Sequence, residues 1–199
     1  FLLCFLAYRP ARLLRVVLSL VSCVLAVLWR RMDGNAARDF IKERLIVACV
    51  RGARKEEVER HVAGLVDRIV RNGLRRDALA VIEQHRQRGD RLVLLSASPD
   101  VYVAALAERL RFDQWISTEL LWEGEVLQGS FKSPNRRGEA KAGVVRALRA
   151  ANGERIVAYA NSTSDIAHLQ LAEEALLVNG STRARERARR VGLPVATWQ

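Results

Sequence analysis

The spacing of hydrophobic residues divides the chain into a helical N-terminal part and a second part in which helices alternate with short apolar runs. Residues 16–29 form an uncharged apolar run with arginine on both sides. Apolar residues then recur at helical spacing between charged ones over residues 36–50 and 55–70. We therefore predict that residues 1–73 form an all-helical domain.

The second part has the pattern of an α/β fold. Short continuous apolar runs, typical of buried parallel strands, occur at residues 91–95, 155–159, 176–178 and 194–197. Helical patterns separate them at residues 76–88, 99–110 and 138–151, and a hairpin is predicted within residues 115–131. This alternation predicts that residues 74–199 form a parallel sheet with helices on both faces.

The apolar run at residues 16–29 allows two interpretations. It is shorter than the about 20 apolar residues that a bilayer-spanning helix needs, and no small-residue cleavage site of a signal peptide follows it. The helix either lies at a membrane interface, with its flanking arginines toward anionic headgroups, or is the buried helix of a small helical domain.

The net positive charge limits the kinds of molecule that the chain is expected to bind. The chain has 33 Lys and Arg against 22 Asp and Glu, a formal net charge of +11. A cationic surface attracts phosphate on nucleic acid, lipid headgroups or small esters, although the arginines between residues 183 and 190 equally fit a solvated helix face. The four Trp, three Tyr and five Phe show no stacking cluster, so nucleic acid is not the expected partner.

The cysteines and histidines do not form a recognisable site in the sequence. Three cysteines stand far apart in apolar helical surroundings: Cys4, Cys23 and Cys49. Without paired spacing they predict neither a disulfide framework nor a zinc site, and we expect core residues in a reducing compartment, the cytoplasm. His61, His85 and His168 also lack ligand spacing, and we expect solvated or capping roles for them.

Ligands of open parallel sheets bind at the carboxyl ends of the strands, so the residues after each predicted strand are candidates. Ser96-Ala97-Ser98-Pro99 follows the strand at residues 91–95. A hydroxyl at a strand end, followed by the N–H groups of a helix N-terminus, can hold an anion. Taken alone, Ser96 or Ser98 equally fits a helix cap.

Two further segments add a cation and two oxygen ligands. Lys141 lies in the first turn of a predicted helix, where a positive charge is tolerated if it faces an anion; a solvated lysine is the alternative. Asn161 and Asp165 follow the strand at residues 155–159, and together they can address one Mg²⁺ ion. Alternatively, Ser162 caps a helix and Asp165 stands at its third position, as in a capping box.

In order and spacing, these segments resemble motifs II, III and IV of the haloacid dehalogenase (HAD) superfamily. The stretches concerned are LVLLSASPD (92–100), PNRRGEAK (134–141) and YANSTSDIAHL (159–169). The resemblance is closest to subfamily IB, the phosphoserine phosphatase-like branch that includes lipid phosphatases of the phosphatidylglycerophosphatase C type. It implies a HAD-like Rossmannoid parallel sheet with an all-helical cap inserted between motif I and motif II.

The resemblance also implies a role for each matching residue. Ser96 would bind the transferring phosphoryl group, aided by the N–H of Ala97. Lys141 would neutralise the charge of the phosphate. Asn161 and Asp165 would stand at the Mg²⁺-binding positions. The nucleophile would be an aspartate of motif I.

The sequence departs from the family at two points. It contains no Asp-x-Asp motif I, so we expect a fragment that is inactive on its own. The missing strand would lie between the motif II and motif IV strands, and its absence would expose unpaired edges and leave the chain poorly stable or prone to aggregate. Ala160-Asn161 replaces the usual Gly-Asp, which would weaken metal binding.

These features lead to two functional expectations. The first is a magnesium-dependent phosphatase in its full-length form, acting on a phospholipid or other small phosphate ester. It would be cytoplasmic and peripheral on the inner face of the membrane, in contact with an anionic membrane surface. The alternative is a catalytically inactive HAD-like protein that binds a phosphorylated or membrane ligand.

Overall fold

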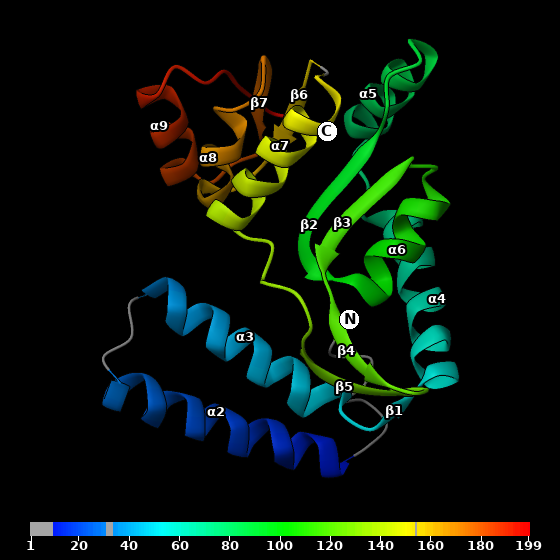
Figure 1. The fold of residues 1–199 in the computed structure, drawn as a ribbon, viewed down its shortest axis with the longest axis vertical. Helices are drawn as coiled ribbons and strands as arrows, with labels where there is room; N and C mark the ends of the chain where they lie inside the picture. Colours follow the sequence, from blue (N-terminus) through cyan, green and yellow to red (C-terminus); the bar gives the residue numbers. More distant parts are fainter. Residues whose placement is uncertain (1–9, 31–33, 154) are drawn as a thin grey trace. The chain divides into compact units, whose positions relative to one another are not determined.

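The computed structural model describes residues 10–30, 34–153 and 155–199 (Figure 1). Its helices are α2 (Pro10–Arg30), α3 (Gly34–Val50), α4 (Lys55–Asn72), α5 (Arg76–Gln87), α6 (Asp100–Arg109), α7 (Glu139–Asn152), the short 3₁₀-helix η1 (Thr163–Asp165), α8 (Ile166–Leu169) and α9 (Thr182–Arg190). Its strands are β1 (Ala53–Arg54), β2 (Val93–Pro99), β3 (Gln114–Thr118), β4 (Leu120–Glu123), β5 (Val126–Phe131), β6 (Val157–Ala160), β7 (Glu174–Val178) and β8 (Val195–Ala196). The α/β fold class predicted from the sequence is confirmed.

The chain folds into two compact units whose segments alternate along the sequence. The first takes the described residues up to Asn72 together with Ser98–Arg111 and Ser117–Asn135, and the second takes the remainder. The helical segment thus shares a unit with α6 and the hairpin of β4 and β5. The expected boundary at residue 73 and the role of residues 1–73 as a cap stay predictions.

Unit one combines helices with a small antiparallel sheet of order β1-β5-β4. The predicted hairpin is confirmed, but β1 was not expected in a segment that we predicted to be all-helical. Its two residues pair with Val126 and Leu127 of β5. Ile46, Val62 and Leu120 belong to the core on which α3, α4 and the hairpin meet.

Gly129 allows β5 to lie against α3. Its φ is +79°, and a Cβ atom there would stand 2.8 Å from Val50 Cγ2 and 3.1 Å from Val47 Cα. Any other residue would combine a strained backbone with a collision against the helix. The absence of a side chain at this position therefore sets the distance between strand and helix.

Helix α2 packs on α3 by one side and leaves its other side exposed. Eight described apolar residues, here called the outer face, have 42–62% of their surface exposed: Leu13, Leu14, Val17, Leu18, Leu20, Val21, Val24 and Leu25. The interpretation as a buried helix is therefore wrong. In the described part of the chain, no helix is long and apolar enough to cross a membrane.

Unit two contains a parallel sheet of order β6-β7-β8. These strands correspond to the last three predicted apolar runs, and their parallel pairing is confirmed. Leu177 of β7 is fully buried in the core of this unit with Leu169 of α8 and Ala184 of α9. The chain order of strand and helix follows the predicted alternation.

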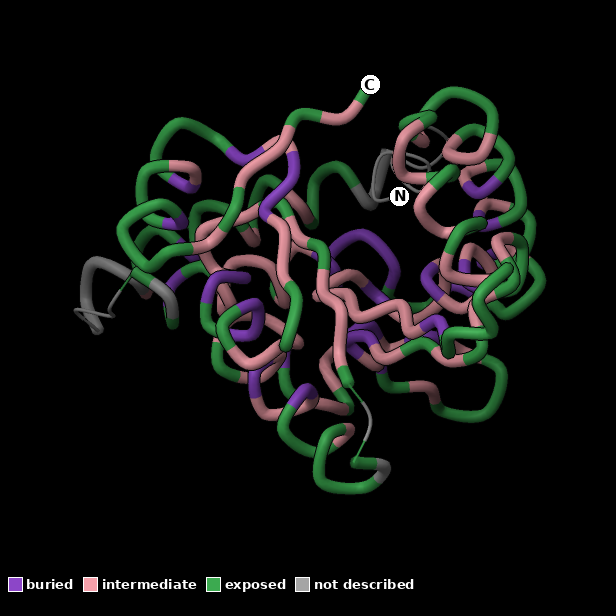
Figure 2. The backbone as a smooth tube through the Cα atoms, turned by 90° about the horizontal axis from the view of Figure 1, so that it is seen from above, coloured by how far each residue is buried: buried purple, intermediate pink, exposed green. Residues whose placement is uncertain are grey.

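The strands β2 and β6 lie in different sheets. β2 pairs with β3 in a separate two-stranded sheet, and β6 pairs only with β7 among the described strands. Most residues of both strands are of intermediate burial (Figure 2), although the sequence predicted fully buried strands.

The cysteines agree with the expectation as far as they are described. Cys23 and Cys49 are buried in unit one. Cys4 and Arg31 lie outside the described residues.

Candidate functional site

The structure brings two of the predicted site residues into direct contact. Lys141 lies in the first turn of α7, and Asp165 is the last residue of η1, which follows β6. The ammonium Nζ of Lys141 donates a hydrogen bond to Asp165 Oδ1 at 2.9 Å. The two side chains are only 12% and 7% exposed, so the solvated lysine considered from the sequence is excluded.

The second carboxylate oxygen of Asp165 is held by Ser162. The backbone N–H of Ser162 donates to Oδ2 at 3.3 Å and its hydroxyl at 2.7 Å. Ser164 in turn lies 2.8 Å from the Ser162 hydroxyl. The arrangement is that of a capping box, so this interpretation of Asp165 is confirmed, while its role as a Mg²⁺ ligand stays a prediction.

The charge state of Asp165 follows from these contacts. Burial by itself raises the pKa of this carboxyl, but the Lys141 ammonium and the hydrogen bonds from Lys141 and Ser162 outweigh it, so the pKa lies below the ordinary value. The carboxylate is therefore ionised at neutral pH. The site is a fixed pair of opposite charges in a largely buried position.

His168 was missed by the sequence analysis, which expected a solvated or capping histidine. It is 5% exposed, and its Nδ1 has no hydrogen-bond partner among the described residues. Burial, followed by the charge of Lys141, lowers the pKa of His168 to about 4. The ring is thus neutral at pH 7, and its 3.8 Å separation from Asp165 Oδ1 is neither an ion pair nor a hydrogen bond. Its spacing of three residues from Asp165 was the available signal.

Ser96 and Ala97 are inner residues of β2, because this strand continues to Pro99 instead of ending at residue 95. Pro99 occupies the cap position of α6, so neither Ser96 nor Ser98 is the cap residue of that helix. Both Ser96 and Ala97 belong to the same unit as Lys141 and Asp165, on a strand of a different sheet.

Asn161 is exposed between β6 and η1. The described residues contain no group of three or more His, Cys, Asp or Glu side chains that could hold a metal ion. The two predicted metal ligands are the Asn161 amide and the Asp165 carboxylate, and the carboxylate is paired to Lys141 and Ser162.

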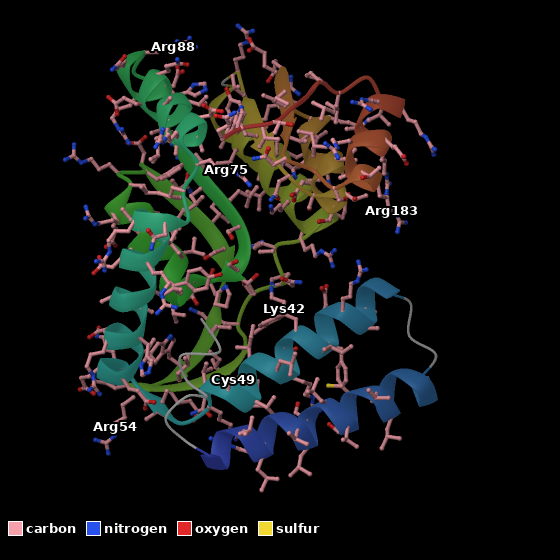
Figure 3. All side chains as sticks on the ribbon, turned by 180° about the vertical axis from the view of Figure 1, so that it is seen from behind. Lys42, Cys49, Arg54, Arg75, Arg88 and Arg183 are labelled. Carbon is pink, nitrogen blue, oxygen red and sulfur yellow. The ribbon has the colours of Figure 1, made fainter. Side chains whose placement is uncertain are left out.

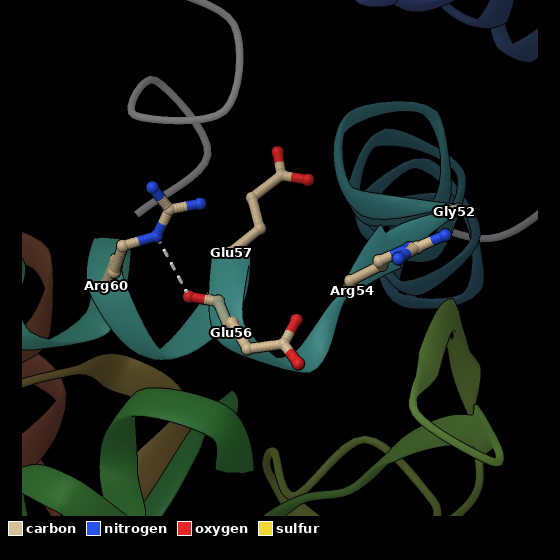
Figure 4. A pocket seen from close by; sticks show the side chains of 5 residues that line it. All are labelled: Gly52, Arg54, Glu56, Glu57 and Arg60. Atoms are coloured by element: carbon tan, nitrogen blue, oxygen red, sulfur yellow. Dashed lines mark hydrogen bonds between the residues drawn. The ribbon is translucent and has the colours of Figure 1, made fainter.

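A pocket lies elsewhere, in unit one at the start of α4 (Figure 4). Arg54, Glu56, Glu57 and Arg60 line it, with Gly52 at its edge. The Nε of Arg60 donates to the carbonyl of Glu56 at 3.2 Å. Its charges are mixed and none of the predicted site residues contributes to it, so we assign it no role.

Solved structures share this fold. A protein of unknown function from Bordetella pertussis Tohama I superposes with a TM-score of 0.70 at 19% identity, covering 88% of this chain and 79% of that one. A phosphoserine phosphatase, solved as a phospho-aspartyl intermediate analogue, has a TM-score of 0.61 at 15% identity, covering 88% of this chain and 78% of that one.

Sequence comparison connects the chain to a family. Protein CicA of Caulobacter vibrioides is 29% identical over 164 residues, which cover 79% of this chain and 69% of CicA. The model of the haloacid dehalogenase-like hydrolase family matches residues 1–170, a range that includes Ser96, Lys141 and Asp165. The chain therefore belongs to the haloacid dehalogenase-like hydrolase family.

Proposed function

We propose that the protein containing this chain is a magnesium-dependent phosphomonoester hydrolase. The observation that carries the proposal is the buried Lys141–Asp165 pair, with 2.9 Å between Nζ and Oδ1, at the positions where the family resemblance expects a phosphate-binding cation and a metal ligand. Family membership supports a hydrolase, and the fold shared with a phosphoserine phosphatase is in keeping with phosphate esters as substrates.

Phosphoryl transfer depends mainly on positioning and on neutralising negative charge. In our proposal Lys141 supplies a positive charge that Asp165 holds in place, and this charge faces the phosphate. Ser96 and the N–H of Ala97 bind phosphoryl oxygens. Because Ser96 lies within β2, it can bind the phosphate only if its side chain lies on the face of the strand where the phosphate binds.

The donors fit Mg²⁺ by their chemistry, because this ion prefers oxygen ligands and retains several waters. Asn161 and Asp165 would hold it, and when bound it would neutralise part of the phosphate charge. An amide oxygen carries no charge, so Asn161 contributes less to affinity than a carboxylate would. The low pKa of Asp165 keeps one charged ligand available at neutral pH.

The nucleophile in this proposal is an aspartate outside the 199 residues, since the sequence has no Asp-x-Asp pair. The phospho-aspartyl form of the similar phosphoserine phosphatase supports an aspartate. Its carboxylate oxygen would bond to phosphorus as the ester oxygen leaves with a proton. Water would then cleave the acyl phosphate, releasing inorganic phosphate and restoring the carboxylate.

An inactive relative that binds a phosphorylated ligand is the second candidate. The exposed Asn161, in place of a carboxylate, favours it. Such a protein would keep Lys141 as an anion site without turnover.

The substrate in our proposal is an amphiphilic phosphate ester such as a phospholipid, met by a protein that is peripheral to an anionic membrane. The outer face of α2 supports this.

The test is phosphate release from a panel of phosphomonoesters by the longest open reading frame that contains this chain, with Mg²⁺ and with EDTA. We expect phosphate release in the presence of Mg²⁺ and no release in the presence of EDTA. Asn161→Asp should restore a second charged ligand and lower the Mg²⁺ concentration for half-maximal activity by about tenfold or more. Absence of release from every ester would reject the enzyme in favour of the inactive relative.

A further inference from the structure

An ordinary surface helix turns its apolar side chains toward the protein core, whereas most large apolar side chains of α2 face outward. Its large residues project away from α3 on the outer face, where carbon-only side chains are visible (Figure 3). With about 3.6 residues per turn, the outer face covers an arc of roughly 160°. An apolar surface of this width on a helix is unusual in water and marks a site of interaction.

The side of α2 that contacts α3 carries small residues. The less exposed positions on this side are Val16 and three small residues, Ser19, Cys23 and Ala26, spaced three and four apart. Cys23 is 1% exposed, and the Ser19 hydroxyl donates to the carbonyl of Arg44 at 3.4 Å. Small residues between helices with large apolar ones outside are the arrangement found where lipid surrounds a helix pair.

Positive charge borders this surface. Residues 10–30 contain no Asp or Glu. Arg15 is exposed and donates to the carbonyl of Arg51, another exposed arginine, at 3.5 Å. Arg38 and Arg44 are exposed on the neighbouring α3. Lysine and arginine beside an apolar helix face attract anionic lipid headgroups.

We propose that the outer face of α2 docks on an anionic bilayer, with its leucines and valines below the headgroups and the neighbouring arginines among them. The helix would lie in the membrane plane, which its length and sequence permit without spanning. A second copy is the less suitable occupant, because it would bring equally basic surroundings together, in a chain of net charge +11. This inference rests on the proposed function in one respect only: the membrane is also where an amphiphilic phosphate ester would be found.

The experiment is co-sedimentation with vesicles of the protein encoded by the longest open reading frame that contains this chain, measured without any phosphate monoester. One set is phosphatidylcholine, and the other is phosphatidylcholine with an equal amount of phosphatidylglycerol. We expect binding to the second set that persists in part at about 1 M salt, where the screening length falls to about 3 Å, because apolar insertion survives screening. Leu18→Glu/Leu25→Glu should weaken binding by at least about tenfold.

The matched control is Leu79→Glu/Val191→Glu, which changes two residues of 40% and 42% exposure in unit two and should bind as the unaltered chain does. Leu18→Ser/Leu25→Ser provides a milder second variant, and circular dichroism checks the helix content of each. Lys141→Ala should also bind normally, so failure of the phosphatase proposal leaves this result intact. No binding to anionic vesicles, equal binding by both glutamate variants, or a dimer that Leu18→Glu/Leu25→Glu dissociates would overturn the proposal.

Discussion

At the scale of single residues, the contact of Lys141 with Asp165 combines function and stability. Both groups are largely buried, and each compensates the charge of the other. Removal of one partner leaves a buried ion without its counterion, which costs more than the pair contributes when intact. The proposed phosphate site is therefore also a point on which the second unit depends.

We predict that Lys141→Met lowers the free energy of unfolding by about 3 kcal/mol, because the Asp165 carboxylate loses its buried counterion. Lys141→Met/Asp165→Asn should be more stable than Lys141→Met, since the amide is neutral and its oxygen still accepts the hydrogen bonds from Ser162. Urea denaturation measures both. If the double variant were less stable than the single one, the two residues would not act as a compensating pair.

Asp100 gives a second prediction, for the dependence of stability on pH. Burial raises the pKa of this carboxyl above its ordinary value of 3.8, against the N–H groups of Leu120 and Val101, which lower it. The folded state thus holds the proton more tightly, and stability falls as pH rises from 3.8 through the raised pKa.

Asp100→Asn keeps an oxygen for the N–H of Leu120, which Asp100 accepts at 3.1 Å, and removes the buried charge. The variant should be more stable than the unaltered chain at pH 7, with the difference disappearing in acid. Thermal unfolding across pH measures this. Asp67→Asn is the control, because it makes the same replacement at a side chain that is 58% exposed, where we expect a change in stability at pH 7 of at most about 1 kcal/mol. If Asp100→Asn were less stable than the unaltered chain at pH 7, the hydrogen bonds that the Asp100 carboxylate accepts from Leu120 and Val101 would contribute more to stability than burial of its charge costs.

Burial of particular residues was the part of the site that could not be predicted from the sequence. The contact of Lys141 with Asp165 agrees with the sequence analysis, because residues after parallel strands and at helix starts follow directly from the order of elements. His168 was missed because its burial depends on how α8 packs within the second unit. Polarity at a helical position does not reveal such packing.

At the scale of elements, local patterns predicted most helices and strands, and contacts distant in sequence accounted for the exceptions. The helices at residues 36–50 and 55–70 follow from apolar spacing, and the structure has α3 and α4 there. β1 is only two residues long and exists through its pairing with β5, which no local pattern reveals. The end of β2 was placed too early because the continuous apolar run stops at residue 95, whereas the strand continues to Pro99.

The close approach of β5 to α3 gives a third prediction. Gly129→Ala should destabilise the first unit by about 2–4 kcal/mol, because backbone strain at positive φ adds to overpacking against Val50 and Val47. Gly52→Ala is the control: its φ is +80°, but no atom lies within 4 Å of the added Cβ. Chemical denaturation should show a clearly larger loss for Gly129→Ala. Equal losses would mean that strain alone matters and that the contact with α3 is unimportant.

At the scale of the whole molecule, the two units contain different functional features. The second unit contains the Lys141–Asp165 pair and the parallel sheet, and the first contains the apolar outer face of α2. The alternation of segments between units was not predictable from the sequence, because a chain that returns to an earlier unit leaves no local mark in composition. The family of hydrolases, in contrast, was predictable from three short motifs in the correct order.

The central claim is that Lys141 serves phosphate chemistry, and a pair of lysine variants tests it most directly. The measurement is Mg²⁺-dependent phosphate release, as kcat and KM, by the longest reading frame containing this chain, carrying either Lys141→Ala or Lys132→Ala. Lys132 is 63% exposed and its loss should leave both constants unchanged.

We predict that Lys141→Ala lowers kcat by at least about a hundredfold, since a fixed charge at the phosphoryl group contributes several kcal/mol to the transition state. Circular dichroism at the assay temperature establishes that the variant is folded. Equal activity of the two variants, in folded protein, would contradict the account and reduce the Lys141–Asp165 pair to a structural contact.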